Sequence, residues 1–216
     1  MVANGRSNRE YRCSAAREPA STSAAMTIFG WMIFALWLAL IAYWGLAAAG
    51  LRRTVGGRWV WWREIAVRLA FFALVVAAIQ VAFMYHPLPG AGLYAGNTSL
   101  ATGVAGFALC AAGIALAISG RACLERSRAA ASAQGDPGLI TTGPYALVRH
   151  PIYSGLLLAL IGSAIGQSVL WLLPLVVYAP RFISSARHEE QLLSEQFPER
   201  YPAYRKRTRM LLPYLW

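Results

Sequence analysis

Long stretches of this 216-residue chain carry no charged side chain, and no other feature restricts its fold as strongly. The strongly apolar stretches include residues 26–51, 69–85, 99–119 and 152–180. A helix needs about 20 apolar residues to cross a bilayer. The chain is 57% hydrophobic and only 13% charged, against about 25% charged in ordinary soluble domains. We therefore expect an integral membrane protein, and we exclude disordered, coiled-coil and disulfide-scaffold classes.

The uncharged stretches predict an all-α, polytopic fold with five transmembrane helices and a cytoplasmic C-terminal helix. The last two spans share one stretch that is too long for a single crossing, and Gly166-Gln167-Ser168 near its middle predicts a tight hairpin. Residues 26–216 form a single predicted domain, preceded by a predicted disordered tail over residues 1–25. The predicted spans are 26–51, 69–88, 99–119, 152–166 and 168–186.

The net charge of +11 comes mostly from arginines in the short connecting segments. Segments 52–68 and 120–151 are rich in Arg, whereas segment 86–98 and the hairpin turn carry no charge. The positive-inside rule places the first two in the cytoplasm, together with the C-terminus, and predicts a bacterial inner-membrane protein. The arginines of the tail do not fit this orientation. Because the basic residues do not gather on one soluble face, we expect no nucleic-acid partner, and the three cysteines form no metal-ligand set.

The first informative polar segment, Gly138–Gly155, lies directly before the predicted fourth span. Gly143-Pro144 predicts a turn. Pro151 disfavours helix at His150 and suits a first helical position, so we expect a helix to begin at Pro151. Its free N–H groups would face the cytoplasmic interface, where they suit a carboxylate or a phosphate.

A simpler interpretation of the same segment is a turn at which the chain enters the membrane. Arg149 would then extend to the interface, Tyr145 and Tyr153 would join the aromatic belt, and Gly155 would serve helix packing. Gly162 and Gly166 form a GxxxG pattern that also predicts helix packing.

The second informative segment, Arg187–Arg205, follows the predicted fifth span. The spacing of Glu189, Leu192 and Phe197 predicts an amphipathic helix that leaves the membrane and ends near Phe197. Acidic residues concentrate here, and Glu189 and Glu190 near the membrane surface suit a ligand ammonium or ribose hydroxyls. The alternative is a solvated helix with surface ion pairs.

Read together, the two segments resemble the isoprenylcysteine carboxyl methyltransferases and their bacterial relatives, over residues 95–215. Phospholipid methyltransferases and methanethiol S-methyltransferases are similar in the same region. The resemblance rests on Gly143-Pro144-Tyr145, Arg149-His150-Pro151-x-Tyr153-x-Gly155, Glu189-Glu190, and the spacing of Phe197, Tyr201 and Tyr204.

The resemblance implies an integral membrane enzyme that uses S-adenosylmethionine, with a small or lipophilic methyl acceptor and the lipid bilayer as its partners and with no metal. The cofactor would lie between the loop before the fourth span and the C-terminal helix. The residues implied to contact it are Leu139, Ile140, Tyr145, His150, Pro151, Ile152, Tyr153 and Glu189.

The chain departs from the family at the substrate site. Where the eukaryotic carboxyl methyltransferases have a substrate-binding Arg, this sequence has Ser185, with Arg181 and Arg187 on either side as candidate substrate-binding residues. No catalytic residue is assigned, and His150, Glu190 and Arg187 are the candidates. Two other functions stay open: an NADPH-dependent membrane sterol or fatty-acyl reductase, and a non-enzymatic subunit of a membrane transporter.

Overall fold

The computed structural model describes residues 20–52, 99–134 and 138–211. Within these ranges the chain is helical and forms no strand. The predicted second span, 69–88, and residues 1–19 of the predicted tail lie outside the described residues. The helices are α2 (Ala20–Arg52), α4 (Leu100–Gln134), η1 (Gly143–Ala146), α5 (Pro151–Gly166), η2 (Val169–Trp171), α6 (Leu172–Gln196) and α7 (Arg200–Arg207).

Three helical stretches are long and apolar enough to cross a membrane: Ile28–Ala47, Leu100–Ala130 and Val169–Gln196. They correspond to the first, third and fifth predicted spans. The predicted fourth span forms α5, whose 16 residues measure about 24 Å, somewhat less than the roughly 30 Å of a hydrocarbon core. The predicted hairpin is confirmed, because α5 ends at Gly166 and helix resumes at Val169.

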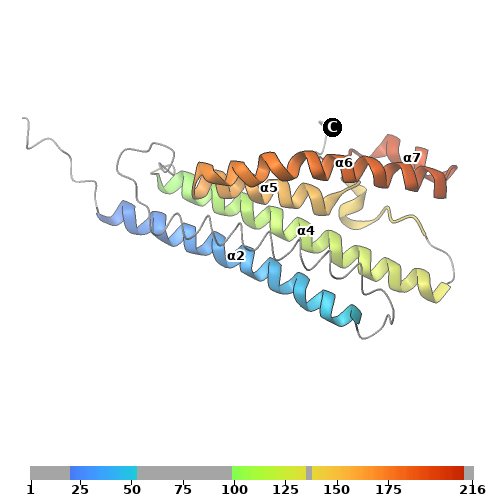
Figure 1. Ribbon diagram of the computed structural model, residues 1–216, viewed down its shortest axis with the longest axis horizontal. Helices are drawn as coiled ribbons and strands as arrows, with labels where there is room; N and C mark the ends of the chain where they lie inside the picture. The colour runs from blue at the N-terminus through green and yellow to red at the C-terminus, as the bar shows by residue number, and fades with distance from the viewer. Residues whose placement is uncertain (1–19, 53–98, 135–137, 212–216) are drawn as a thin grey trace, which may run out of the picture.

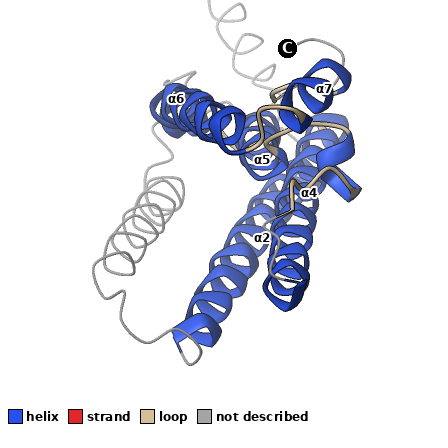
Figure 2. Cartoon of the chain, turned by 90° about the vertical axis from the view of Figure 1, so that its right-hand side faces the viewer, coloured by secondary structure: helices blue, strands red, loops and turns tan. Residues whose placement is uncertain are grey.

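The helices pack side by side in the order α2, α4, α5, α6 (Figures 1 and 2). Glycines bring α4 and α5 into backbone contact. A Cβ on Gly113 would lie 2.5 Å from the carbonyl oxygen of Gly155, and a Cβ on Gly162 would lie 2.4 Å from the backbone nitrogen of Cys110. Small residues allow such approach in lipid, where dispersion contacts hold helices together. The packing role predicted for Gly162 and Gly166 is confirmed.

A tryptophan pair fixes α2 against the α5–α6 hairpin. The fully buried indole rings of Trp37 and Trp171 stack with their centroids 5.5 Å apart. Trp37 Nε1 donates to Ser163 Oγ at 3.0 Å, and Trp171 Nε1 donates to Gln167 Oε1 at 2.8 Å. Because unpaired polar groups are costly in lipid, these bonds make the arrangement specific.

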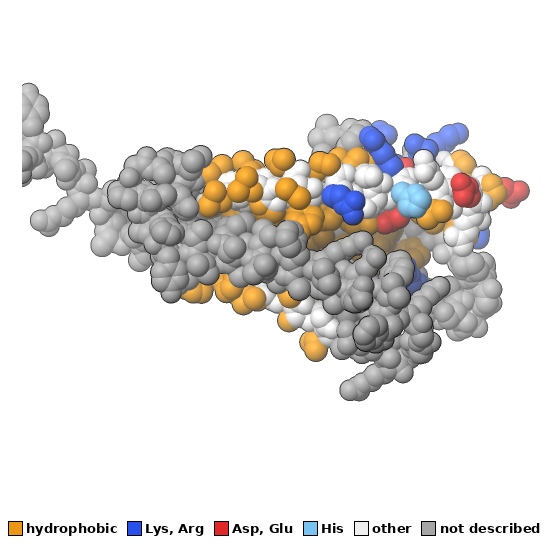
Figure 3. Space-filling view, viewed as in Figure 1, with side chains coloured by type: hydrophobic (Ala, Val, Ile, Leu, Met, Phe, Trp, Pro, Cys, Tyr) orange, Lys and Arg blue, Asp and Glu red, His pale blue; other side chains and the backbone are white. Residues whose placement is uncertain are grey.

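The molecule has an apolar part and a charged end. In Figure 3, hydrophobic side chains gather on the left part of the visible face, and Lys, Arg, Asp, Glu and His gather at the right end over α6 and α7. The charged residues of α4 and α6 lie in the C-terminal parts of these two helices, at this end. The two segments identified from the sequence meet there.

Candidate functional site

The loop before α5 forms the first side of the site. It contains the η1 turn, which Gly143 enters with φ of +62°, a left-handed conformation that favours glycine. Helix α5 begins at Pro151 with His150 at the N-cap, as predicted. The backbone turn therefore places His150 at the boundary between the loop and the apolar helix.

The chain after α7 fixes this loop from outside. Val148 forms a parallel β-bridge with Arg209. The backbone nitrogen of Arg149 donates to the carbonyl of Arg209 at 2.8 Å, and that of His150 donates to the carbonyl of Met210 at 3.2 Å. The C-terminal segment thus supplies main-chain acceptors that hold the loop in place.

A buried ion pair joins the loop to α6. Nε of Arg149 lies 2.6 Å from Oε1 of Glu190, and the two side chains are 9% and 8% exposed. The same guanidinium donates through NH1 to the carbonyl of Thr208 at 2.5 Å and to that of Arg205 at 3.3 Å. Because Arg149 contacts three segments of the chain, it connects the loop, α6 and the end of α7.

His150 lies between two carboxylates. Its Nδ1 is 3.2 Å from Oε2 of Glu189, and its Nε2 is 3.5 Å from Oε1 of Glu190. Burial disfavours the imidazolium and lowers the pKa of His150, but hydrogen bonding and the negative charges of the two carboxylates outweigh burial. The net effect raises the pKa above its ordinary value. The site therefore favours the charged form of His150.

The two adjacent carboxylates occupy different environments. Glu190 is buried and paired, whereas the Glu189 side chain is 47% exposed. Glu189 Oε1 accepts a hydrogen bond of 2.5 Å from the Tyr153 hydroxyl. Of the two, Glu189 is the carboxylate that an incoming ligand can reach.

An aromatic stack runs from this carboxylate into the apolar part of the molecule. The ring of Tyr153 stacks on His150 at 5.7 Å on one side and on Phe182 at 5.1 Å on the other. Tyr178 continues the stack at 5.8 Å from Phe182. The aromatic faces connect the charged end of the site with the apolar stretch of α6.

The structure brings most of the implied cofactor residues together. Tyr145 is half-buried, and its pKa is raised to about 12, first by burial and then by the nearby Cys123 thiol and Glu189 carboxylate. Pro151 is buried and Ile152 is half-buried at the start of α5, while Leu139 and Ile140 lie half-buried in the loop. Tyr145, His150, Tyr153 and Glu189 thus form one group of neighbours.

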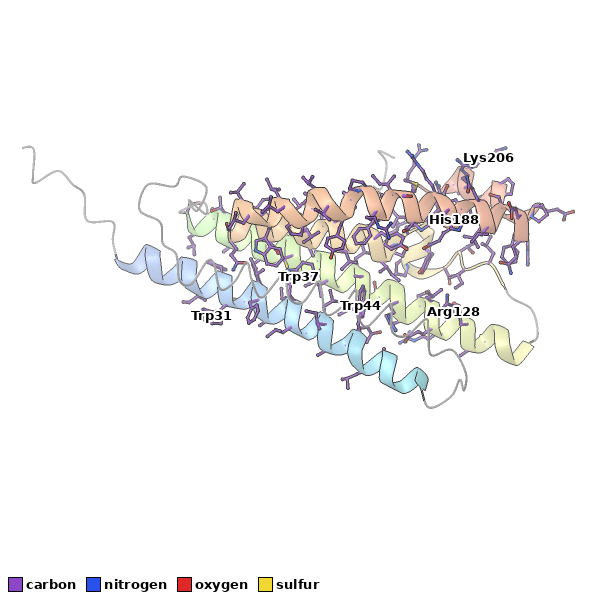
Figure 4. The ribbon with its side chains drawn as sticks, viewed as in Figure 1. Trp31, Trp37, Trp44, Arg128, His188 and Lys206 are labelled. Carbon is purple, nitrogen blue, oxygen red and sulfur yellow. The ribbon has the colours of Figure 1, made fainter. Side chains whose placement is uncertain are left out.

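The candidate substrate-binding arginines lie elsewhere. Arg181 and Arg187 are exposed on α6, and neither forms an ion pair with any carboxylate in the described ranges. His188 is also exposed on α6, as Figure 4 shows. Ser185 lies instead beside the Tyr153 hydroxyl. Among the described residues no ion pair links the candidate arginines to the group around His150, and their substrate-binding role stays a prediction.

The sequence does not predict that Arg149 connects the loop with α6 and α7. It indicates only a cation at the membrane interface. The sequence does not show which groups Arg149 will contact, because two of its hydrogen-bond acceptors are the main-chain carbonyls of Arg205 and Thr208. Side-chain patterns do not reveal such acceptors. Arg128 of α4 was also missed, although its charge acts on Glu189 and Tyr145.

Comparisons with known proteins address the same part of the chain. Residues 101–200 match the family model described as phospholipid methyltransferase. Two curated proteins are similar: the nickel-cobalt-cadmium resistance protein NccN of Alcaligenes xylosoxydans xylosoxydans and the cobalt-zinc-cadmium resistance protein CzcN of Cupriavidus metallidurans. Each is 28% identical over 153 residues, which is 68% of this chain.

The chain spans slightly less than two thirds of these relatives, 65% of NccN and 64% of CzcN. No solved structure matches the chain significantly. The family match includes α5, α6, nearly all of α4 and the loop that carries His150. The helices and loop that build the candidate site are therefore similar in sequence to the phospholipid methyltransferases, a family of membrane methyltransferases.

Proposed function

We propose that this protein is an integral membrane methyltransferase that uses S-adenosylmethionine and acts on a small or lipophilic acceptor at the cytoplasmic face of the membrane. The observation that carries the proposal is the position of His150 and Glu189. They come from the two motifs that suggested the activity, and they lie 3.2 Å apart within the region of the family match.

The residues present fit such a cofactor. Nε2 of His150 is buried, and its contact with Oε1 of Glu190 at 3.5 Å is longer than a well-formed hydrogen bond, so this nitrogen can still donate to a ligand. Glu189 offers a carboxylate that is half exposed, which suits the ammonium or ribose hydroxyls of the cofactor. Tyr153, which bonds that carboxylate, and the neighbouring Tyr145 supply aromatic surface for the cofactor.

We therefore assign the cofactor to Leu139, Ile140, Tyr145, Glu189 and the run 150–153. When bound, S-adenosylmethionine supplies a sulfonium methyl group, to which the acceptor's lone pair forms a bond as the carbon–sulfur bond breaks. The protein's part is to align the acceptor and exclude water. The buried Arg149–Glu190 pair and the C-terminal segment hold the loop for this purpose.

The acceptor determines whether a proton must be removed. A carboxylate or thiolate is already nucleophilic, whereas an ammonium must first lose a proton. His150 favours its charged form and Glu190 is paired with Arg149, so neither is well suited to receive that proton. Glu189 is in turn paired with His150 and assigned to the cofactor, so the group favours an acceptor that is already nucleophilic.

The names of the two relatives favour a second candidate function. Both are described as metal resistance proteins, and by analogy this chain would be a non-enzymatic subunit of a metal-export system. Within the described ranges, no group of three or more His, Cys, Asp and Glu side chains could hold a metal ion. Because the family match and the contact between His150 and Glu189 support the methyltransferase, we place the transport subunit second.

Thermal unfolding of the purified protein in detergent separates these functions. A ligand that binds only the folded state raises the melting temperature by mass action. We expect S-adenosylhomocysteine to stabilise the protein, and NADPH, Ni²⁺ and Co²⁺ to leave it unchanged. Stabilisation by NADPH would favour the reductase, and stabilisation by a metal ion alone would favour the transport subunit.

Product analysis then identifies the acceptor class. The protein is incubated with methyl-labelled S-adenosylmethionine and, in separate reactions, a prenylcysteine, a small thiol and an aminophospholipid. Mass spectrometry detects the labelled product. Absence of label in all three, despite binding of S-adenosylhomocysteine, would exclude these acceptors but not the cofactor.

A further inference from the structure

A second concave site lies outside the group around His150. It is a pocket of about 470 Å³ between loop 138–146 and helix α7, a volume typical of sites for small molecules. Six of the residues that line it are Leu139, Thr141, Arg200, Tyr204, Arg207 and Thr208. The methyltransferase proposal uses none of them except Leu139.

The pocket is positively charged for a reason of helical geometry. Residues 200, 203, 204 and 207 are spaced so that they share one face of α7. Arg200 and Arg207 of this face line the pocket, and none of the described lining residues is acidic. The two Cα atoms lie about 10 Å apart along the helix, close enough for both long side chains to reach one ligand.

The basic residues of α7 differ in what they contact. Arg205 approaches Oε2 of Glu190 at 3.8 Å and so belongs to the ion-pair group beneath the helix. Arg200 and Arg207 form no ion pair with any carboxylate in the part of the chain that the structure describes. Their charges remain available to a ligand of opposite sign.

The walls of the pocket are held by internal hydrogen bonds. Tyr204 donates its hydroxyl to the carbonyl of Tyr145 at 2.7 Å, and Thr208 donates its hydroxyl to the carbonyl of Tyr204 at 2.9 Å. The hydroxyl protons of Tyr204 and Thr208 are therefore not available to a ligand. The guanidinium groups of Arg200 and Arg207 and the exposed Thr141 hydroxyl remain as donors for a ligand.

From this arrangement we propose that the pocket binds a phosphate-bearing ligand. Two planar guanidinium groups and a hydroxyl match the several acceptor oxygens of a phosphate, which guanidinium binds in a bidentate manner. The volume leaves room for the group that is esterified to the phosphate. The pocket shares Leu139 with the proposed cofactor site, but its two arginines lie outside that site, and its proposed ligand differs from S-adenosylmethionine, which carries no phosphate.

The test uses calorimetric titration of the full-length protein in detergent with three probes. They are sn-glycerol 3-phosphate, dioctanoyl phosphatidic acid and, as a phosphate-free control, dioctanoyl glycerol. We expect binding of a phosphate-bearing probe and none of the control. Equal binding of both phosphates indicates a soluble phosphate ester as ligand, and binding of the lipid alone indicates a headgroup.

Variants locate the site. Arg200→Gln/Arg207→Gln should weaken binding about tenfold or more, as expected for the loss of charge-assisted hydrogen bonds. The control Arg126→Gln/Lys206→Gln removes the same charge from exposed positions outside the pocket lining and should bind as the wild type does. Arg200→Lys/Arg207→Lys should restore part of the affinity.

Three results would overturn the proposal. The first is that the wild type binds neither phosphate probe. The second is that both charge-removing double variants lose affinity equally. The third is that saturating S-adenosylhomocysteine displaces the probe. The second result would indicate only general surface charge, and the third would make the pocket part of the cofactor site. Because the probes contain no methyl donor, these outcomes do not depend on the methyltransferase proposal.

Discussion

The Arg149 guanidinium and the Glu190 carboxylate form a buried ion pair, with Nε and Oε1 2.6 Å apart. The pair connects two segments 41 residues apart in the chain, the loop before α5 and the C-terminal part of α6. Both motifs of the candidate site depend on it for their relative position. Substitutions at and beside this pair can therefore distinguish a loss of stability from a loss of ligand affinity.

Glu190→Gln should destabilise the protein by about 3–5 kcal/mol, because it leaves the buried charge of Arg149 without its partner. The control is Glu125→Gln, which breaks the more exposed pair with Arg121 on α4 and should cost only about 0.3–0.5 kcal/mol. Chemical unfolding in detergent measures both. Similar losses in the two variants would show that the buried pair has no special structural role.

Glu189→Gln should weaken binding of S-adenosylhomocysteine about 10- to 150-fold, the cost of losing a charge-assisted hydrogen bond to the ligand. Its melting temperature should fall less than that of Glu190→Gln, since the Glu189 side chain is half exposed. Calorimetric titration compares it with Glu190→Gln, for which we expect the smaller loss of affinity. Equal affinities in the folded variants would contradict the assignment of Glu189.

The stability of the wild type should fall as pH rises above 6.5. The folded state raises the pKa of His150, so between 6.5 and this raised value it binds more protons than the unfolded state. Stabilisation by the Glu189 and Glu190 carboxylates is complete below pH 6.5 and is lost as pH passes through the raised pKa. His150→Gln should lack this dependence, whereas His188→Gln, altered at an exposed position, should keep it. An unchanged pH profile in His150→Gln would exclude His150 as its source.

Gly155→Ala should lower the melting temperature, since the added Cβ would meet the Gly113 carbonyl oxygen at 2.4 Å. Overpacking of this kind costs about 1–3 kcal/mol. The control Gly45→Ala places its Cβ in open space on α2 and should be tolerated. The folded fraction of Gly155→Ala should still bind S-adenosylhomocysteine. Loss of binding at unchanged stability would instead place the ligand against Gly155.

The orientation in the membrane can be tested in intact cells with a variant that lacks native cysteines. A membrane-impermeant maleimide should label Ser99→Cys, at the start of α4, and should not label Lys206→Cys on α7 until the cells are permeabilised. This follows from the loop charges, which place the arginine-rich segments in the cytoplasm. The reverse pattern of labelling would invert the topology.

Local signals in the sequence predicted several elements correctly. Pro151 indicates a helix start because its ring disfavours helical backbone at the preceding residue, and α5 begins there. The periodic pattern around Glu189 marked a helix up to Phe197, and α6 ends at Gln196. Each signal acts within a few residues of the feature that it predicts. The predicted second span lies outside the described residues and stays a prediction.

The sequence by itself determined the membrane environment, because hydropathy depends on composition along each stretch. It also determined the helix boundaries near the site, because turn residues such as Gly and Pro act within a few positions. Tertiary structure alone decided that Glu190 is the buried partner of Arg149 while Glu189 remains half exposed. Two adjacent carboxylates look equivalent in sequence. They separate in the fold because successive helical positions point about 100° apart, so that Glu190 meets the buried Arg149 guanidinium while Glu189 contacts His150 from a half-exposed position.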